Sequence, residues 1–414
     1  MLPDEVHHPT GVARVIGKGC EPMVLEKSRY DALTAEDLQG ALGVKWTMFP
    51  DCIGAFIAEM DYGSSPEIQE ELRAAVDAGF FGYLPKAKET QLAEATAGWY
   101  HRHTDWDVRA DQIHSMPDVL KGFELTLTRY APKGGKVILP TPAYMPFMSM
   151  PGIYGREIIE VPMLRTGYGW EYDFDAIEQA FRDGGEVLVV CNPHNPIGKV
   201  ARRDEMEQLA EIVDRYDGRV FSDEIHAPLV YNGNEHVPYA SISEKAAGHT
   251  ITAIAASKAW NLAGLKCAQV VISNDADKDV WDSGASWVAH GAATLGVVAS
   301  IAAYERSEAW LDEVIDYLDG NRARLAELVE EHLPGVTYIR PEGTYLAWLD
   351  FTATKVPENV QEFFREKAKV AITDGSACGE VGKRCVRFNF SMSRPMLETA
   401  IARMGEAVRS LDEA

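Results

Sequence analysis

Ser222-Asp223-Glu224-Ile225-His226 and, further along the chain, Ser257-Lys258 are the two stretches that decide the fold. Each follows a short apolar run that predicts a β-strand, residues 219–221 before the first and residues 250–254 before the second. Short, continuous apolar strands that alternate with helices are typical of a largely parallel sheet covered on both faces. Ligands bind such sheets beyond the carboxyl ends of the strands. We therefore expect Asp223 and Lys258 to share one crevice.

An acid and a lysine at neighbouring strand ends suit the chemistry of pyridoxal 5'-phosphate (PLP). This cofactor forms a Schiff base with a lysine amine, and a carboxylate keeps its pyridine nitrogen protonated. Lys258 comes directly after an apolar strand, which is an awkward place for a solvated cation. The Pro-rich turn of residues 192–198 follows another expected strand and brings Asn195 to the same edge. These residues lead to the hypothesis of a PLP-dependent enzyme.

Composition limits the class of protein and its partners. A chain of 414 residues is too long for one simple core, so two domains are expected. The net charge of −23 disfavours nucleic acid and anionic membrane surfaces as partners. The six cysteines are scattered without a CxxC pair, so neither a metal site nor a disulfide framework is expected. We see no signal peptide and no apolar run of the roughly 20 residues that span a bilayer, and we expect a cytoplasmic protein.

The pattern along the chain changes near residue 292. Before it we expect helices at 119–130, 174–181 and 204–216, strands at 112–116, 137–139, 187–190, 220–221 and 250–255, and a helix that Ser65 caps, with Ile68, Leu72 and Val76 on its apolar stripe. After it, helices at 295–306 and 310–333 lead into a compact α+β unit. The expected domains are an arm (1–25), a first part of a small domain (26–60), a large PLP-binding domain (61–291) and the rest of the small domain (292–414).

The chain resembles a known enzyme family over roughly residues 30 to 410. It is similar to the fold-type-I PLP-dependent enzymes of the class I/II aminotransferase superfamily, and within them to the MalY/PatB-like cystathionine beta-lyase (C–S lyase) branch. The resemblance rests on these segments, in chain order: Phe56-Ile57-Ala58-Glu59-Met60-Asp61, Phe81-Gly82-Tyr83, Thr141-Pro142-Ala143-Tyr144, Asn192-Pro193-His194-Asn195-Pro196-Ile197-Gly198-Lys199-Val200, Ser222-Asp223-Glu224-Ile225-His226, Ser257-Lys258-Ala259-Trp260-Asn261-Leu262-Ala263-Gly264-Leu265-Lys266, Thr344-Tyr345-Leu346-Ala347-Trp348-Leu349-Asp350 and Val386-Arg387-Phe388-Asn389. It implies an α/β fold in which a mostly parallel seven-stranded sheet lies between helices, beside a smaller α+β domain.

The resemblance implies roles for four residues around the cofactor ring. Lys258 carries the Schiff base and, once released, moves a proton at the substrate Cα. Asp223 pairs with the pyridinium nitrogen, and Asn195 hydrogen-bonds the phenolic oxygen of the ring. Tyr144 stacks on the ring. Lys258, Asp223 and Tyr144 are the candidate catalytic residues.

The cofactor phosphate needs several donors, and the chain departs from the family here. Backbone N–H groups of Val119 and Leu120, at a helix start, are expected to bind the dianion. Ser257 and Lys266 are expected to add contacts, although superfamily members often carry arginine at the second position. The usual glycine and serine of the helix-entry loop are Met116 and Asp118, and the usual hydroxyl three residues before the lysine is Ala255. Tyr83 is expected to reach the phosphate of a neighbouring subunit, which implies a homodimer with active sites at the subunit interface.

The substrate side of the site is expected to hold a small amino acid. Arg387 matches the arginine that grips the α-carboxylate, as a bidentate clamp. Tyr345 and Asn195 are further candidates for substrate binding, although core packing is an equally good interpretation of Tyr345. Alternation along a strand sends His226 to the face opposite Asp223, so we expect a structural or supporting role for His226.

The expected reaction is α,β-elimination. L-cystathionine or another S-substituted L-cysteine would yield a thiol, pyruvate and ammonia. An aminotransferase uses the same lysine and aspartate and stays open as an alternative, as does a C–S lyase or decarboxylating deaminase that acts on a secondary-metabolite cysteine conjugate. A regulatory protein that keeps PLP as a relic is a further alternative, which the intact set of Lys258, Asp223, Asn195 and Arg387 disfavours.

Overall fold

The computed structural model describes residues 28–41, 43–131, 133–167 and 169–412. Its larger sheet has seven strands, of which only one, β10, runs against the others. In spatial order the strands are β2 (Ile113–Met116), β10 (Ala268–Ile272), β9 (Thr250–Ile254), β8 (Arg219–Asp223), β7 (Gly185–Cys191), β3 (Lys136–Thr141) and β4 (Ile158–Pro162). This is the mostly parallel seven-stranded sheet that the sequence led us to expect.

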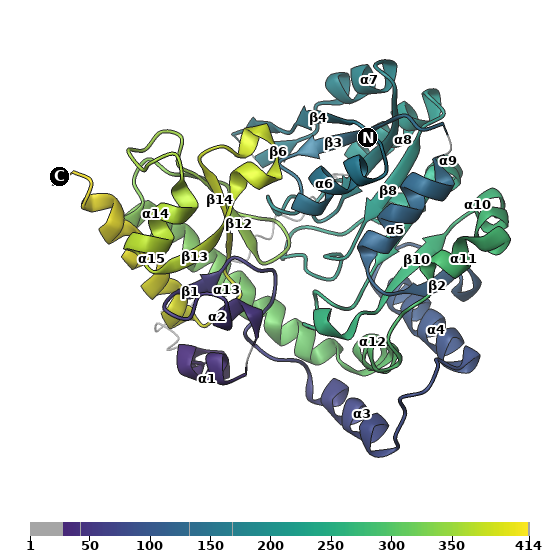
Figure 1. Cartoon of the computed structure of the whole chain (residues 1–414), viewed down its shortest axis with the longest axis horizontal. Helices are drawn as coiled ribbons and strands as arrows, with labels where there is room; N and C mark the ends of the chain where they lie inside the picture. Colours follow the sequence, from purple (N-terminus) through teal and green to yellow (C-terminus); the bar gives the residue numbers. More distant parts are fainter. Residues whose placement is uncertain (1–27, 42, 132, 168, 413–414) are drawn as a thin grey trace, which may run out of the picture.

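Helices cover both faces of this sheet (Figure 1) because its strands are apolar on both sides. Alternate residues of β7 enter different cores, Val187 and Val189 on one face and Leu188 and Val190 on the other. The first face packs against α5 (Val119–Leu125), α6 (Met145–Ile153), α10 (Asp275–Val280) and α11 (Ser286–Ala289). The second packs against α7 (Phe174–Arg182), α8 (Arg203–Arg215) and α9 (Glu244–His249).

A second sheet joins the two ends of the described chain. Its five strands are, in spatial order, β1 (Ile53–Ala55), β13 (Val370–Asp374), β14 (Cys385–Asn389), β12 (Leu346–Asp350) and β11 (Thr337–Tyr338). Strand β1 pairs in parallel with β13, so the N-terminal segment completes a sheet whose other strands come from the last quarter of the chain. Figure 1 shows this segment, in purple, against the green and yellow C-terminal elements. A separate hairpin is formed by β5 (Leu164–Thr166) and β6 (Gly169–Glu171).

The remaining helices surround the second sheet and connect it to the first. Helix α12 (Thr294–Arg306) packs on α3 (Pro66–Asp77) and α4 (Lys86–His103). The others are α1 (Ala35–Gly40), α2 (Val44–Thr47), α13 (Glu308–His332), α14 (Val360–Lys367) and α15 (Arg394–Arg409). Within the residues that the structure describes, no single helix is long and apolar enough to cross a membrane, and only the bent pair 275–289 with 294–306 passes a test of length and composition.

Most expected elements are confirmed, with shifts of a few residues at their ends. The Ser65 hydroxyl accepts a hydrogen bond from the Ile68 N–H and caps α3 as expected. Val76 is 47% exposed, so its assignment to the buried stripe of α3 is wrong, because this helix packs through its Ile68 side. The expected helix 119–130 ends its α-helical part at Leu125 and continues as a π-helical turn, residues 126–130. The expected arm lies outside the described residues.

Candidate active site

The parallel register of three strands places Asp223 at the edge where the predicted site lies. Asp223 ends β8 and pairs with Cys191 of β7 and Ala253 of β9. Two hydrogen bonds fix the chain where it leaves the strands: the Asn192 N–H, just after β7, donates to the Asp223 carbonyl (2.9 Å), and the Glu224 N–H, just after β8, donates to the Ala253 carbonyl (2.9 Å). The Pro-rich turn after β7 and the turn after β9 that carries Lys258 therefore begin on either side of Asp223.

Asp223 is a buried carboxylate that lacks a cationic partner. It is 2% exposed, and its Oδ1 accepts one hydrogen bond, from the Ile225 N–H at 3.1 Å. No ion pair joins it to another described residue. Burial raises its pKa to about 7, against the lowering effect of the Ile225 hydrogen bond. A buried carboxylate of this kind suits a cationic ring nitrogen, whose charge would lower the pKa again.

Lys258 is held at the same edge with its amine pointing toward the N-terminal segment. Its Nζ donates a hydrogen bond to the Ala58 carbonyl at 2.9 Å. Burial and the nearby Arg387 charge lower its pKa to about 8, although Glu59 and Asp223 oppose this shift. A lysine amine that loses its proton near neutral pH is ready to form a covalent bond to an aldehyde.

Arg387 lies on β14 of the smaller sheet and reaches across to the larger one. Its Nη1 donates to the Asn195 Oδ1 at 3.1 Å, and its Nη2 donates to the Phe56 carbonyl at 2.8 Å and the Thr373 Oγ1 at 3.3 Å. The guanidinium is 3% exposed, and its Nε has no hydrogen-bond partner among the described residues. An arginine that is buried without a carboxylate partner provides a site for a substrate carboxylate.

One cavity of about 580 Å³ brings most of these side chains together. The sequence-predicted residues that line it are Val119, Tyr144, Asn195, Asp223, Lys258 and Arg387. Leu120 and Ser257 adjoin wall residues in the chain, and Lys266 bonds to Asp118, the residue before Val119, but none of the three lines the cavity. Tyr345 is buried and does not line the cavity itself, but its hydroxyl donates to the carbonyl of the lining residue Ala58 (3.0 Å), which also accepts from Lys258.

The expected orientation of His226 is wrong. Strand β8 ends at Asp223, and the chain then turns, so strand alternation does not extend to residue 226. His226 lines the same cavity as Lys258, and its Nδ1 has no partner among the described residues. Burial and nearby cations lower its pKa well below the ordinary value, so the imidazole is neutral at physiological pH. Glu224, in contrast, points away into a buried network with Ser222 and His236.

The helix-entry loop shows what the unusual Asp118 does. Its Oδ1 accepts from the Lys121 N–H (3.1 Å) and so caps α5, while its Oδ2 lies 2.6 Å from the Lys266 Nζ. The aspartate therefore neutralises the lysine that was expected to bind phosphate. The N–H groups of Val119 and Leu120 are in the first turn of α5 and have no acceptor in the described chain.

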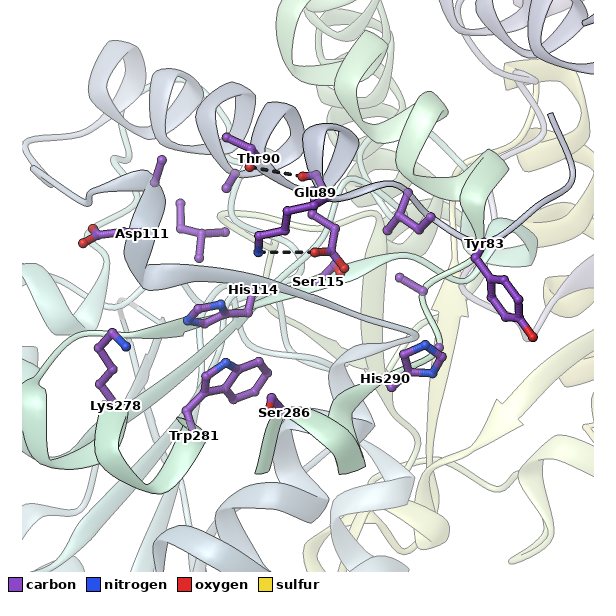
Figure 2. A pocket seen from close by; sticks show the side chains of 17 residues that line it. Tyr83, Glu89, Thr90, Asp111, His114, Ser115, Lys278, Trp281, Ser286 and His290 are labelled. Atoms are coloured by element: carbon purple, nitrogen blue, oxygen red, sulfur yellow. Dashed lines mark hydrogen bonds and ion pairs between the residues drawn. The ribbon is translucent and has the colours of Figure 1, made fainter. Parts of the chain in front are cut away.

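A second and larger cavity, of about 670 Å³, shares no described lining residue with this site; its walls are drawn in Figure 2. Tyr83 is at its edge and is 94% exposed, with its ring turned away from His114 and Trp281 (Figure 2). Lys86 and Glu89 form an ion pair along its wall. Tyr83 does not line the cavity that contains Lys258.

Part of the cavity wall was not predicted from the sequence. Val44, Met48 and Phe49, on and after α2, line it together with Ile57 and Ile372. Apart from Ile57, which lies in the family-like segment 56–61, these residues carry no motif, and they reach the site because β1 and α2 join the C-terminal sheet. Only that long-range pairing, which local sequence patterns do not show, could have identified them.

Comparisons with known proteins agree with this geometry. The family described as "Aminotransferase class I and II" matches residues 52–404. A cystathionine beta-lyase of Corynebacterium glutamicum is 40% identical over 90% of this chain and 98% of its own length. Cystalysin of Treponema denticola, whose crystal structure contains PLP, is 28% identical, with a TM-score of 0.86 and coverage of 92% and 99%. A PLP-bound C–S lyase of Staphylococcus hominis is 26% identical, with a TM-score of 0.84 and the same coverage.

The fold and the site define a fold-type-I PLP-dependent enzyme. The chain belongs to the class I and II aminotransferase family, and within it to the branch of the cystathionine beta-lyases and C–S lyases, which confirms the resemblance seen in the sequence. The residues present fit PLP, since the cavity offers an uncompensated buried carboxylate, a lysine with a lowered pKa and free N–H groups at a helix start.

Proposed function

We propose that this enzyme cleaves the Cβ–S bond of S-substituted L-cysteines, L-cystathionine among them, by α,β-elimination. The observation that carries the proposal is the presence of Lys258, Asp223, Asn195 and Arg387 on one cavity wall. The C. glutamicum relative is named a cystathionine beta-lyase, and the S. hominis protein is named a C–S lyase. Both names support this reaction over the alternatives.

Each residue of the set has one task in this reaction. Bound PLP supplies a pyridinium ring that accepts the charge that develops at the substrate Cα. Asp223 keeps a proton on the ring nitrogen, and Asn195, in the turn after the neighbouring strand β7, orients the ring. Arg387 binds the α-carboxylate and fixes the Cα–H bond within reach of Lys258.

Lys258 removes the Cα proton, and the Cβ–S bond breaks with its electron pair on sulfur. The sulfur leaves as a thiolate and takes up a proton to become the thiol. One water molecule is consumed when the remaining three carbons and nitrogen leave as pyruvate and ammonium. Tyr144 closes one side of the cavity, where burial raises its pKa and keeps its hydroxyl protonated.

A product assay tests this proposal. The PLP-loaded protein is incubated with L-cystathionine, with and without a 2-oxo acid, and pyruvate and free thiol are measured. Pyruvate formed without the 2-oxo acid supports the lyase. Amino transfer that depends on the 2-oxo acid would instead identify an aminotransferase, and absence of both products would contradict the proposal.

We further propose that the enzyme is a homodimer in which Tyr83 of one subunit reaches the phosphate end of the other site. The 94% exposed Tyr83, the 67% exposed Phe81 and the 84% exposed Trp287 support this, because large apolar side chains are rarely left in water without a partner. Sedimentation at micromolar concentration tests the dimer. A Tyr83→Phe variant that keeps the dimer but binds PLP more weakly would support the contact across the interface, and unchanged PLP affinity would contradict it.

Two further proposals concern domains and location. We infer an N-terminal arm (1–25), a small domain built from 26–60 and 292–414, and a large domain of 61–291; the pairing of β1 with β13 supports the composite small domain. We infer a cytoplasmic location, which the five free cysteines among the described residues support, because a reducing compartment keeps thiols unpaired.

A further inference from the structure

The cavity around Lys258 has an apolar wall on the side of the small sheet. We define the small-sheet wall as Val44, Met48, Phe49, Phe56, Ile57 and Ile372. Met48 is 56% exposed and Val44 is 44% exposed, so both present apolar surface to the open part of the cavity. The rings of Phe49 and Phe56 meet edge to face with centroids 5.3 Å apart.

The small-sheet wall begins where the substrate is clamped. The Arg387 Nη2 donates to the Phe56 carbonyl at 2.8 Å and to the Oγ1 of Thr373 at 3.3 Å, and Thr373 is the residue of β13 that lies directly opposite Arg387. A substrate whose α-carboxylate is bound by Arg387 therefore lies directly beside Phe56 and its neighbours. Its sulfur substituent has the small-sheet wall within reach.

The described part of the cavity wall offers no unused cation to a second carboxylate, that is, one carried by the sulfur substituent of a substrate. Among the described residues, the cations that line it are Lys258 and Arg387, and both already have tasks in the reaction. Glu59 and Asp374 also line the cavity and would repel an anion. His226 offers a neutral imidazole. Arg365 lies over the Phe49 ring at 5.6 Å but pairs with Glu362 and does not line the cavity.

We infer that the preferred substrates are L-cysteine thioethers with an uncharged apolar group on sulfur, in preference to those with a second carboxylate. This inference rests on the proposed lyase function and names its substrate class. The apolar group gains from transfer out of water onto the small-sheet wall, in proportion to the area buried. A distal carboxylate would be desolvated without a cation to compensate it.

A homologous series of substrates tests the inference, because it changes buried area while the leaving thiolate stays similar. The PLP-loaded enzyme is assayed with S-methyl-, S-ethyl-, S-propyl- and S-butyl-L-cysteine, with S-carboxymethyl-L-cysteine and with L-cystathionine. We expect kcat/KM to rise about fourfold for each added methylene. S-propyl-L-cysteine should exceed S-carboxymethyl-L-cysteine at least tenfold, and should exceed L-cystathionine by a smaller factor, because the distal ammonium of L-cystathionine partly compensates its distal carboxylate.

Variants of Met48 connect the preference to the small-sheet wall. Met48→Lys should lower kcat/KM for S-butyl-L-cysteine about tenfold and raise kcat/KM for S-carboxymethyl-L-cysteine. Met48→Gln should lower kcat/KM for S-butyl-L-cysteine without raising kcat/KM for S-carboxymethyl-L-cysteine. Leu164→Lys, at another exposed apolar position outside the cavity, should change neither.

The outcomes separate the two proposals. A flat alkyl series, or a preference for L-cystathionine or S-carboxymethyl-L-cysteine, overturns the substrate class and leaves the lyase function intact. Pyruvate from none of these compounds overturns the lyase function itself. An unchanged ratio of S-butyl- to S-carboxymethyl-L-cysteine in Met48→Lys removes the small-sheet wall as the cause.

Discussion

The Nη1 of Arg387 lies 3.1 Å from the Oδ1 of Asn195, although one residue is on the small sheet and the other follows a strand of the large sheet. This hydrogen bond occupies the amide oxygen of Asn195 and leaves its NH2 group to donate toward a cofactor. The same bond fixes the guanidinium that is expected to bind the substrate. Residues proposed for the cofactor and for the substrate are thus coupled directly.

Arg387→Lys should lower kcat/KM at least about 30-fold, because a lysine loses one charge-assisted hydrogen bond worth about 2 kcal/mol and cannot form a bidentate clamp. Steady-state assays with any cleaved thioether measure the effect, and we expect it mainly in KM. Arg203→Lys, an exposed position on α8, is the matched control and should stay within twofold. Equal activity of both variants would remove Arg387 from substrate binding.

The rate of covalent PLP capture should rise with pH. Burial lowers the pKa of Lys258 to about 8, so the amine is protonated below that pH and free above it. Stopped-flow absorbance of the PLP-free protein should therefore show a rate that increases between about pH 7 and 9 and then levels off. Lys258→Ala should show no covalent absorbance band and no turnover.

Two charged neighbours of Lys258 should shift the pH at which the capture rate reaches half its maximum, and they should shift it in opposite directions. The Arg387 charge lowers the Lys258 pKa and the Glu59 charge raises it. Arg387→Met should therefore shift the midpoint to higher pH, and Glu59→Gln should shift it to lower pH. Shifts of the opposite sign, or a midpoint near that of an exposed lysine, would show that burial and these two charges do not control the amine.

Asp118→Asn should tighten PLP binding about three- to tenfold, or by about 1 kcal/mol, because it frees Lys266 and removes a negative charge beside the phosphate. Asparagine keeps the cap of α5, since its side-chain oxygen can still accept from Lys121. The dissociation constant of PLP, measured by absorbance titration, reports the change. Asp214→Asn, which breaks the exposed ion pair with Lys245, should leave it unaltered. Weaker PLP binding in Asp118→Asn would mean that the aspartate supports the phosphate site.

Lys45→Met should destabilise the protein by about 3 kcal/mol or more. Lys45 and Asp61 form an ion pair at 3.0 Å, and each side chain is 2% exposed, so removal of the lysine leaves a buried carboxylate uncompensated. The double variant Lys45→Met/Asp61→Asn should recover part of the loss, because the amide still accepts from the Trp46 indole N–H. Urea unfolding midpoints of the three proteins test this. A double variant less stable than the single one would contradict the argument.

Local sequence patterns predicted correctly that Asp223 and Lys258 lie in one crevice. Asp223 and Lys258 follow apolar strands, and parallel strands deliver their ends to one edge, so strand prediction alone brings the two together. The turn after a third expected strand added Asn195, and the resemblance to a family added Arg387. The residues alone did not indicate β4 or β10, and β10 breaks the strand–helix alternation because it returns antiparallel beside β9.

Other parts of the site depend on long-range packing and on where strands end. The orientation of His226 was predicted wrongly because β8 stops at Asp223, and that end is set by bonds to neighbouring strands. The small-sheet wall depends on β1 pairing with β13. The bond between Lys266 and Asp118 joins two loops far apart in sequence, so only the three-dimensional structure shows that the aspartate neutralises the lysine charge.

The parallel pairing of β1 with β13 has a consequence for how the chain acquires its shape during synthesis. Translation delivers Ile53–Ala55 early and Val370–Ile372 only near the end, so the first strand emerges from the ribosome long before its neighbour exists. The central sheet can assemble meanwhile, whereas the cleft that receives the thioether closes last. A nascent polypeptide truncated before β13 would keep Lys258 and the strand before it but lack one side of its substrate chamber.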